Sequence, residues 1–355
     1  MTLTRTAERP QGDAQPQTPG TIVQLWQKLT RAATTNLAIF PTIAAIVLCL
    51  ALLIFGEVAY GRIFQFSTLS NLLINNAHLI ILAVALTFVI ITGGIDLSVG
   101  AIVALSSVAG VMLAKAGWPP LVVIVVMIGI GSLLGLVSGI LIRYFNVQPF
   151  IATLAMMFLG RGLASLLSTE PERVPDSATA LTWLNTQWKV IDGPKVNDLV
   201  ITPGVVIALL IVAVAWFVLH RTRTGRTVYA IGGSAPSAKL MGLPVERITL
   251  LVYVISGTLA GVAALVYTAR LGTAQNITGI GWELDAIAAA VIGGTLLTGG
   301  FGYVLGSVVG ALVLGLMTVL ITRDGGIRPE MTTIITGGIL LAFVLLQRLV
   351  TRSKE

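Results

Sequence analysis

Long stretches without Asp, Glu, Lys or Arg constrain the fold of this chain more than any other feature. They are residues 37–56, 71–95, 97–114, 116–142, 144–160, 199–220, 248–269, 286–322 and 331–347. An apolar run of ~18 or more residues is typical of a transmembrane helix. The window 286–322 is interrupted by Thr298–Gly302, which predicts two passes joined by a glycine turn, the first one short. The window ending at Gly160 extends to Ser168 and includes Arg161. The sequence therefore predicts an all-α integral membrane protein with about ten transmembrane helices.

The composition excludes several classes of protein. Only 10% of the 355 residues are charged, against ~25% in soluble domains, so a soluble enzyme is excluded. One cysteine, Cys49, and two histidines, His78 and His220, exclude a disulfide framework and a multi-His or Cys-cluster metal site. The chain has no phosphate-binding G-x-x-x-x-G-K-[ST] loop, no H-E-x-x-H and no credible Ser/His/Asp set. We therefore expect no catalytic centre, no metal and no cofactor in this chain.

The distribution of basic residues predicts the orientation. With ten spans and both termini cytoplasmic, the inside segments hold 13 Lys or Arg and 4 Asp or Glu, and the outside segments hold 8 and 10. This bias follows the positive-inside rule, and it explains the net charge of +7 without nucleic acid. The predicted parts are a cytoplasmic segment 1–36, a permease domain 37–350 and a tail 351–355, with a periplasmic loop 169–198 and a cytoplasmic loop 221–247. Residues 22–33 place Ile22, Leu25, Trp26, Leu29 and Ala33 on one face, which fits either an interfacial helix or a partly ordered lead-in.

Glycine patterns predict close helix packing. Gly93-Gly94 followed by Gly100-Ala101 is similar to Gly293-Gly294 followed by later glycines, which predicts an inverted repeat of residues 71–168 and 248–349. Glycines also recur at every fourth residue, and this spacing favours packing within one bundle over a subunit interface. They are Gly131, Gly135 and Gly139; Gly257 and Gly261; and Gly302, Gly306 and Gly310.

The segment Gly93-Gly-Ile-Asp-Leu-Ser-Val-Gly100 contains an acidic residue directly before an uncharged helix. We expect Asp96 to cap that helix, since a carboxylate accepts hydrogen bonds from free amides at a helix start; contact with a solute is the alternative. Asp96, Glu283 and Asp285 all lie at predicted span ends, which argues against proton coupling through mid-span carboxylates.

The cytoplasmic loop 221–247 contains the signals of a short helix. Ser234 is a good N-cap, Pro236 suits a first helical turn, and Gly242 followed by Pro244 suits a helix end. A helix at about 235–241 is too short to be stable alone. It would serve either as a knob that enters a groove of another protein or as a packed connector.

These two segments carry a family resemblance. Gly93–Gly100 and Gly-Arg-x-x-Tyr-Ala-x-Gly-Gly…Ala-Lys-Leu-x-Gly at 225–242, with the Val291-Ile-Gly-Gly-Thr stretch through Gly315, resemble the permease subunits of bacterial ABC sugar importers of the ribose/xylose/arabinose type. The resemblance covers about residues 64–348. Residues 148–162 and 166–170 further resemble galactofuranose importer permeases. Many members have Asn where Ser234 stands, and Ser also caps helices. The matching signature positions are Gly93, Gly94, Asp96, Ser98, Gly100, Gly225, Arg226, Gly232 and Gly233.

The resemblance implies a subunit of the inner membrane that works with partners. Such permeases pair as homodimers or heterodimers and bind two cytoplasmic ATPase subunits, which hold ATP and Mg²⁺, so the missing phosphate loop is expected. A periplasmic binding protein would deliver the sugar near 169–198. The coupling helix would comprise Ser234, Ala235, Pro236, Ser237, Ala238, Lys239, Leu240, Met241 and Gly242.

The candidate path-lining residues are polar groups near span ends or breaks. A sugar path needs hydrogen-bonding side chains that hold the solute loosely. The candidates are Asn71, Asn75, Asn76, Gln148, Thr153, Gln275 and Asn276. The alternatives to a monosaccharide importer are an ABC permease for a nucleoside, a branched-chain amino acid or a signalling sugar, and an ion-coupled secondary transporter.

Overall fold

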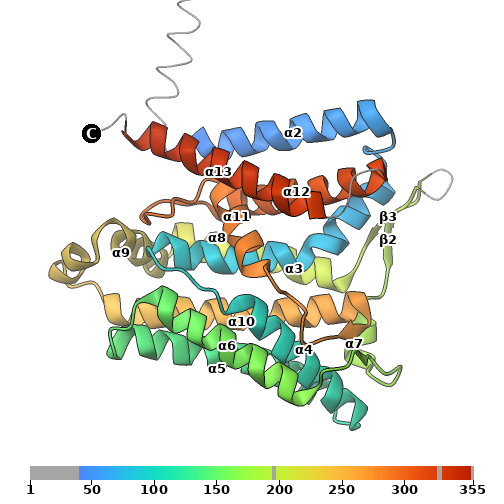
Figure 1. The fold of residues 1–355 in the computed structure, drawn as a ribbon, viewed down its shortest axis with the longest axis horizontal. Coiled ribbons are helices and arrows are strands. Elements are labelled where there is room, and N and C mark those ends of the chain that lie inside the picture. The colour runs from blue at the N-terminus through green and yellow to red at the C-terminus, as the bar shows by residue number, and fades with distance from the viewer. Residues whose placement is uncertain (1–39, 194–196, 326–329, 353–355) are drawn as a thin grey trace, which may run out of the picture. The chain divides into compact units, whose positions relative to one another are not determined.

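A computed structural model describes residues 40–193, 197–325 and 330–352 of the chain, and most of these residues are helical (Figure 1). A helix lies in each of the ten segments in which the sequence predicts one. The predicted interfacial helix within 1–36 and the tail from residue 353 lie outside the described residues. The ten helices are α2 (Phe40–Tyr60), α3 (Phe66–Ile91), α4 (Val99–Lys115), α5 (Pro120–Tyr144), α6 (Pro149–Leu167), α8 (Pro203–Arg221), α10 (Val245–Leu271), α11 (Trp282–Ile292), α12 (Val304–Asp324) and α13 (Glu330–Arg352).

Seven of the described helices are long and apolar enough to cross a membrane. These are α2, α3, α5, α6, α8, α10 and α12. Helix α4 has 17 residues and α11 has 11, and the apolar part of α13 is Thr333–Leu345. At 1.5 Å per residue, α11 is roughly 16 Å long, about half of a hydrocarbon core. The number of complete spans predicted from the sequence, ten, is therefore not established by these helices.

Two helices begin inside the bundle because non-helical segments precede them. After α3 the chain turns at Gly93, which has a φ of 78°, and continues without helix to α4. After α10 it turns at Gly272, with a φ of 71°, and passes through strand β4 (Thr273–Ala274) to α11. The two segments meet where a Cβ at Gly100 would lie 2.3 Å from the carbonyl oxygen of Gly279. Only glycine permits this approach.

The long helices α3 and α10 form the centre of the bundle. Helix α10 packs against α5, α3 and α4, and α3 packs against α12, α11 and α8. A Cβ at Gly131 of α5 would lie 2.1 Å from the carbonyl oxygen of Gly257 of α10, and a Cβ at Gly310 of α12 would lie 1.9 Å from that of Ala289 of α11. The glycines at every fourth residue therefore allow close packing of helices within one chain, as the sequence predicts.

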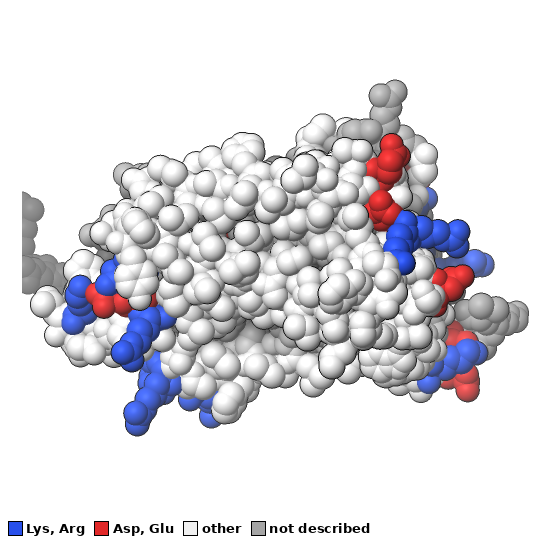
Figure 2. Space-filling model, turned by 90° about the horizontal axis from the view of Figure 1, so that it is seen from below, with Lys and Arg blue, Asp and Glu red and all other residues white. Residues whose placement is uncertain are grey.

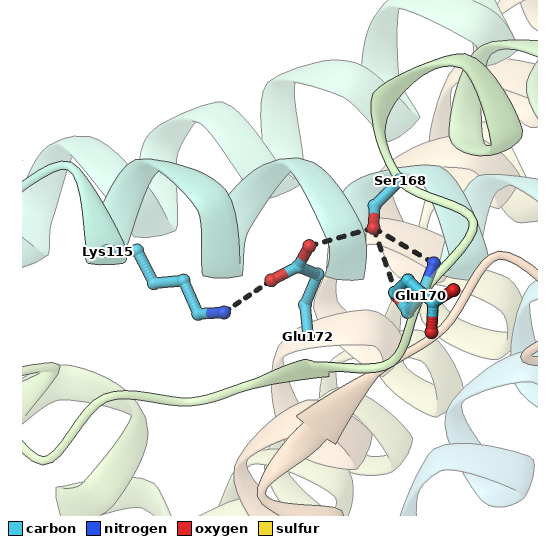
Figure 3. A network of polar contacts seen from close by, with 4 residues as sticks. All are labelled: Lys115, Ser168, Glu170 and Glu172. Carbon is cyan, nitrogen blue, oxygen red and sulfur yellow. Dashed lines mark hydrogen bonds and ion pairs between the residues drawn. The ribbon is translucent and has the colours of Figure 1, made fainter.

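A loop network joins α4 and α6 to the segment after α10 (Figure 3). Strand β1 (Glu172–Arg173) pairs with β4. The Lys115 ammonium donates a hydrogen bond to the Glu172 carboxylate, and the Ser168 hydroxyl donates another at 2.8 Å. These bonds, first that from Lys115, hold the pKa of Glu172 below its ordinary value. The rest of the loop contains α7 (Thr179–Leu184) and the antiparallel pair β2 (Trp188–Ile191) and β3 (Leu199–Ile201).

Charged residues gather at the two ends of the bundle and leave an uncharged belt between them (Figure 2). We call these the α9 end, which carries helix α9 (Arg223–Leu240), and the hairpin end, which carries β2 and β3 (Figure 1). The bases that α5, α8, α9 and α10 carry at the α9 end are Arg143, Arg221, Arg223, Arg226, Lys239 and Arg247, beside the acid Glu246. The hairpin end mixes both signs. The C-terminal end of α13 lies at the α9 end (Figure 1).

Candidate functional site

Helix α9 consists of two helices that meet at a sharp kink. Ser234 has an extended backbone, with φ −167° and ψ 103°, so Arg223–Gly233 and the residues from Ala235 onward point in different directions. The sequence predicts the second helix but not the first. The sequence signal for the first helix is Thr222, whose hydroxyl accepts a hydrogen bond from the backbone N–H of Gly225 at 3.3 Å, as an N-cap does.

The short second helix is capped at both ends as the sequence predicts. The Ser234 hydroxyl accepts a hydrogen bond from the Ser237 backbone N–H at 3.3 Å. At the other end Gly242 has a φ of 75°. The N–H of Gly242 donates to the carbonyl of Lys239 and that of Leu243 donates to the carbonyl of Ala238, at 3.0 and 3.1 Å. This is the glycine-ended cap that terminates many helices.

The short helix presents an apolar surface outward. Leu240 and Met241 are 90% and 67% exposed. Pro236 and Ser237 are exposed beside them. Ala238, by contrast, is fully buried, so it packs toward the bundle and is not part of the outward surface. We call Pro236, Ser237, Leu240 and Met241 the docking surface.

One carboxylate ties the short helix to two long helices. Glu246, at the start of α10, accepts a hydrogen bond from the Lys239 ammonium at 2.9 Å. The same oxygen pairs with the guanidinium of Arg143 at the end of α5. All three groups are partly exposed, and solvent-exposed ion pairs contribute little to stability. We call the two ion pairs of Glu246 the Glu246 clamp. The clamp fixes the position of the short helix more than it stabilises the fold.

The first half of α9 contacts the end of α3 and the non-helical segment 293–303, which joins α11 to α12. A Cβ at Gly232 would lie 1.8 Å from the carbonyl oxygen of Ile91, at the end of α3, and 2.3 Å from the nitrogen of Gly300. The Tyr229 hydroxyl donates to the carbonyl of Gly302 at 2.6 Å. A movement of α9 would thus act directly on the turn before α4 and on the turn after α11.

Asp96 is buried between helices and is not the N-cap residue that the sequence predicts. The N-cap of α4 is Ser98. One Asp96 oxygen accepts from the Ser98 backbone N–H and hydroxyl at 2.9 and 2.6 Å, and the other accepts from the Ser256 hydroxyl of α10 at 2.7 Å. The carboxylate therefore joins the start of α4 to the middle of α10, and it has no free oxygen for a solute.

Most of the other signature residues are glycines, which matter for how closely the backbone can pack. Gly94 lies against the Tyr253 hydroxyl, and Gly225 lies against the carbonyl of Leu219. Gly233 has open space around it, and Arg226 is exposed.

The predicted path-lining residues are not gathered in one place. Gln148 is the N-cap of α6, and the Thr153 hydroxyl is buried and bonded to the carbonyls of Pro149 and Ile95. Asn76 donates to the carbonyl of Leu72. These three have structural surroundings. No hydrogen bond involves the side chain of Asn71, which is exposed, within the described residues.

Two of the candidates, Gln275 and Asn276, lie in the non-helical segment that leads into α11. The Asn276 amide donates to the Ser165 hydroxyl at 3.0 Å, and Gln275 is half-buried next to it. The Arg161 guanidinium donates to the backbone carbonyls of Asn276, at 3.0 Å, and Thr278. Asn75 accepts from Arg270 at 3.2 Å.

The sequence missed a group of aromatic rings and acids at the start of α11. The Trp282 ring centroid lies 4.3 Å from that of His78 and 4.6 Å from that of Tyr267. Glu283 and Asp285 follow in the first turn. Both acids lie at a helix start, which is the start of α11, and this start lies beside Gly100 and His78 within the bundle.

A protein-family model described as "Branched-chain amino acid transport system / permease component" matches residues 68–344. The chain belongs to this permease family. The match spans α3 to α13 and includes both turns and α9. It confirms the family resemblance carried by the glycine-rich motifs.

Curated relatives of the permease agree with this assignment. Fructose import permease protein FruG of Bifidobacterium longum (strain NCC 2705) is 52% identical, over 87% of this chain and 91% of the relative. Inner membrane ABC transporter permease protein YjfF of Escherichia coli (strain K12) is 40% identical, over 78% and 82%. Ribose import permease protein RbsC of the same strain is 39% identical, over 72% and 77%. The chain is thus a multi-pass transport subunit of the bacterial inner membrane and not itself an enzyme.

Proposed function

We propose that this permease imports a monosaccharide, driven by ATP hydrolysis on a separate subunit. The observation that carries the proposal is the docking surface, an exposed apolar face on a capped helix at the basic end of the bundle. A self-sufficient carrier has no use for such a face. Fructose is the first candidate because FruG, named a fructose import permease, is 52% identical to this chain. Ribose, from RbsC, and galactofuranose, from the motif at 148–170, are the next candidates.

The partners follow from this role. The docking surface would enter a groove of a cytoplasmic ABC ATPase, which binds ATP and Mg²⁺ in place of this chain. A second permease, identical or paralogous, would complete the path. A periplasmic sugar-binding protein would meet the hairpin end, where residues 169–193 form a folded cover of α7 and short strands.

The same proposal includes an inverted repeat with both termini in the cytoplasm. Two runs of helices, α3 to α6 and α10 to α13, each contain a long helix followed by a shorter one. Their packing is exchanged, since α5 packs against α10 as α12 packs against α3, and α4 packs against α10 as α11 packs against α3. The basic α9 end supports a cytoplasmic position for that end, and ten membrane segments would then place both termini there.

The coupling route runs from the docking surface to helices α4 and α11. When the ATPase closes, it would move the short helix, and the Glu246 clamp would carry that movement to α5 and α10. Gly232 and Tyr229 would carry it to the turns that hold α4 and α11. Movement of α4 and α11 would then open the path first to one side of the membrane and then to the other.

The test is to purify the tagged chain from its native membrane and to reconstitute what accompanies it. We expect an ATPase subunit, a second permease copy or paralogue, and ATP-dependent uptake of one sugar among fructose, ribose and galactofuranose. Leucine belongs in the same panel because the family model is described by branched-chain amino acid transport. Leucine uptake in place of sugar uptake would favour that alternative. Uptake by this chain without an ATPase, abolished by an uncoupler, would contradict the proposal.

A further inference from the structure

The carboxylate of Asp285 lies at membrane depth without a partner. No hydrogen bond or ion pair involves it among the described residues, and it is half-buried. The other acids near the middle of the bundle have different surroundings. Asp96 has three hydrogen bonds, whereas Glu283 has one buried carboxylate oxygen without a hydrogen-bond partner and lies close enough to Arg161 for electrostatic attraction. A charged side chain in a membrane-spanning region marks a functional site when no structural partner accounts for it.

The depth of Asp285 follows from the rings that pack beside it. His78 lies roughly 18 Å along α3 from the hairpin end, at 1.5 Å per residue. The Trp282 ring lies against the His78 ring, with centroids 4.3 Å apart and the planes tilted by 37°. Asp285 follows Trp282 by three residues on the same face of α11. Along the bundle, the Asp285 carboxylate therefore lies close to the level of the middle of α3, which has 26 residues.

The backbone next to Asp285 cannot face lipid. The segment from Gln275 to Gly281 is not helical, and Ile277 and Ile280 are 60% and 67% exposed. Non-helical backbone at membrane depth occurs only where it is covered by protein or lines a water-filled cavity. The start of α11 therefore faces either the path or a second permease.

Three aromatic rings lie together beside the start of α11. Tyr267, His78 and Trp282 come from three different helices, and all three pairs of ring centroids are 4.3 to 4.9 Å apart. Small-molecule sites combine aromatic surface with a few placed polar groups. A carboxylate accepts hydrogen bonds only, which suits the hydroxyls of a neutral sugar.

We propose that Asp285 and the ring cluster of His78, Tyr267 and Trp282 form a sugar-contact site on the translocation path. The inference rests on the proposed import of a monosaccharide. In this site Asp285 accepts hydrogen bonds from sugar hydroxyls and the exposed edge of the rings covers the apolar face of the sugar. The site does not involve the docking surface, so its loss leaves ATPase binding intact.

The first test compares Asp285→Asn with the wild-type complex in proteoliposomes, using D-fructose with ribose as the second sugar. Asparagine keeps the size but replaces one acceptor oxygen by a donor. We expect sugar uptake to fall at least tenfold while complex assembly and basal ATPase activity stay within twofold. The matched control is Asp324→Asn, an exposed acid at the end of α12 and outside the loop 169–193. Uptake by Asp285→Asn within twofold of wild type overturns the site.

The second test measures water access without relying on transport. The single cysteine, Cys49, makes a cysteine-free background simple. In Cys49→Ala, we expect Asp285→Cys to react with a membrane-impermeant thiol reagent and D-fructose to slow that reaction. Leu210→Cys, an exposed position in α8, is the lipid-facing control. Labelling of Asp285→Cys no faster than this control, or loss of the permease pair in Asp285→Asn, would assign the face to a subunit contact.

The two proposals fail in different ways. If the wild-type complex imports no sugar, the proposed function fails and the site loses its substrate. If it imports sugar and both variants at Asp285 behave as their controls, only the site is rejected.

Discussion

Gly131 and Gly129 lie on the same helix but differ in what a side chain would meet. A Cβ at Gly131 would lie 2.1 Å from a backbone oxygen of α10, whereas one at Gly129 has nothing within 4 Å. Backbone on both sides leaves no flexible group to move, so α5 and α10 would have to separate. Overpacking of this kind costs about 1–3 kcal/mol, while alanine in place of an exposed helical glycine gains up to about 1 kcal/mol.

We therefore predict that Gly131→Ala lowers the melting temperature of the detergent-purified permease and that Gly129→Ala leaves it unchanged or raises it. The measurement is a thermal unfolding curve of both variants beside wild type. Equal melting temperatures would show that α5 and α10 do not pack as closely as described.

Glu172 gives a second prediction at the scale of a residue. Hydrogen bonds from Lys115 and Ser168 lower its pKa in the folded state. A lowered pKa means that the bonds stabilise the loop above the unfolded pKa, near 4.5, and that this stabilisation is lost as the pH falls through the folded value. We expect the loop 169–193 to exchange amide hydrogens at an intrinsic-corrected rate that is constant from pH 8 to 5 and rises below the folded pKa. In Glu172→Gln the rise should be absent; a rise of equal size there would assign it to another group.

At the scale of elements, the short helix of α9 is the part whose position matters more than its stability. The Glu246 clamp is partly exposed and contributes little to stability, yet it is the described ion-pair link from Lys239 to α5 and α10. Loss of the clamp should therefore leave the fold and ATPase binding intact and weaken the transmission of movement.

We predict that Glu246→Gln uncouples the transporter, with ATPase activity within twofold of wild type and sugar uptake per ATP lowered severalfold. Glu246→Asp should restore part of the ratio because it keeps the charge. Arg247→Gln, at the neighbouring exposed position, is the control. If uptake and ATP hydrolysis fall together in Glu246→Gln, the clamp has a purely structural role.

At the scale of the whole molecule, the sequence predicts where helices lie better than how deep they reach. Uncharged windows locate a helix in each of ten segments, because apolar length is a property of the chain itself. Ser234, Pro236 and Gly242 predict the short helix for the same reason, since caps are local. The interior starts of α4 and α11 depend on contacts such as Gly100 with Gly279, which join residues far apart in the chain. For that reason sequence reasoning misses the ring cluster of His78, Tyr267 and Trp282.

The docking of a separate ATPase at the α9 end is the central claim, and one cross-linking measurement tests it. In a Cys49→Ala background, Met241→Cys would be treated with a bifunctional thiol reagent in the assembled complex, beside Ile191→Cys at the hairpin end. We predict a cross-link to the ATPase subunit from position 241 and none from position 191. A cross-link from position 191 alone, or ATP-driven uptake with position 241 never near the ATPase, would contradict the account.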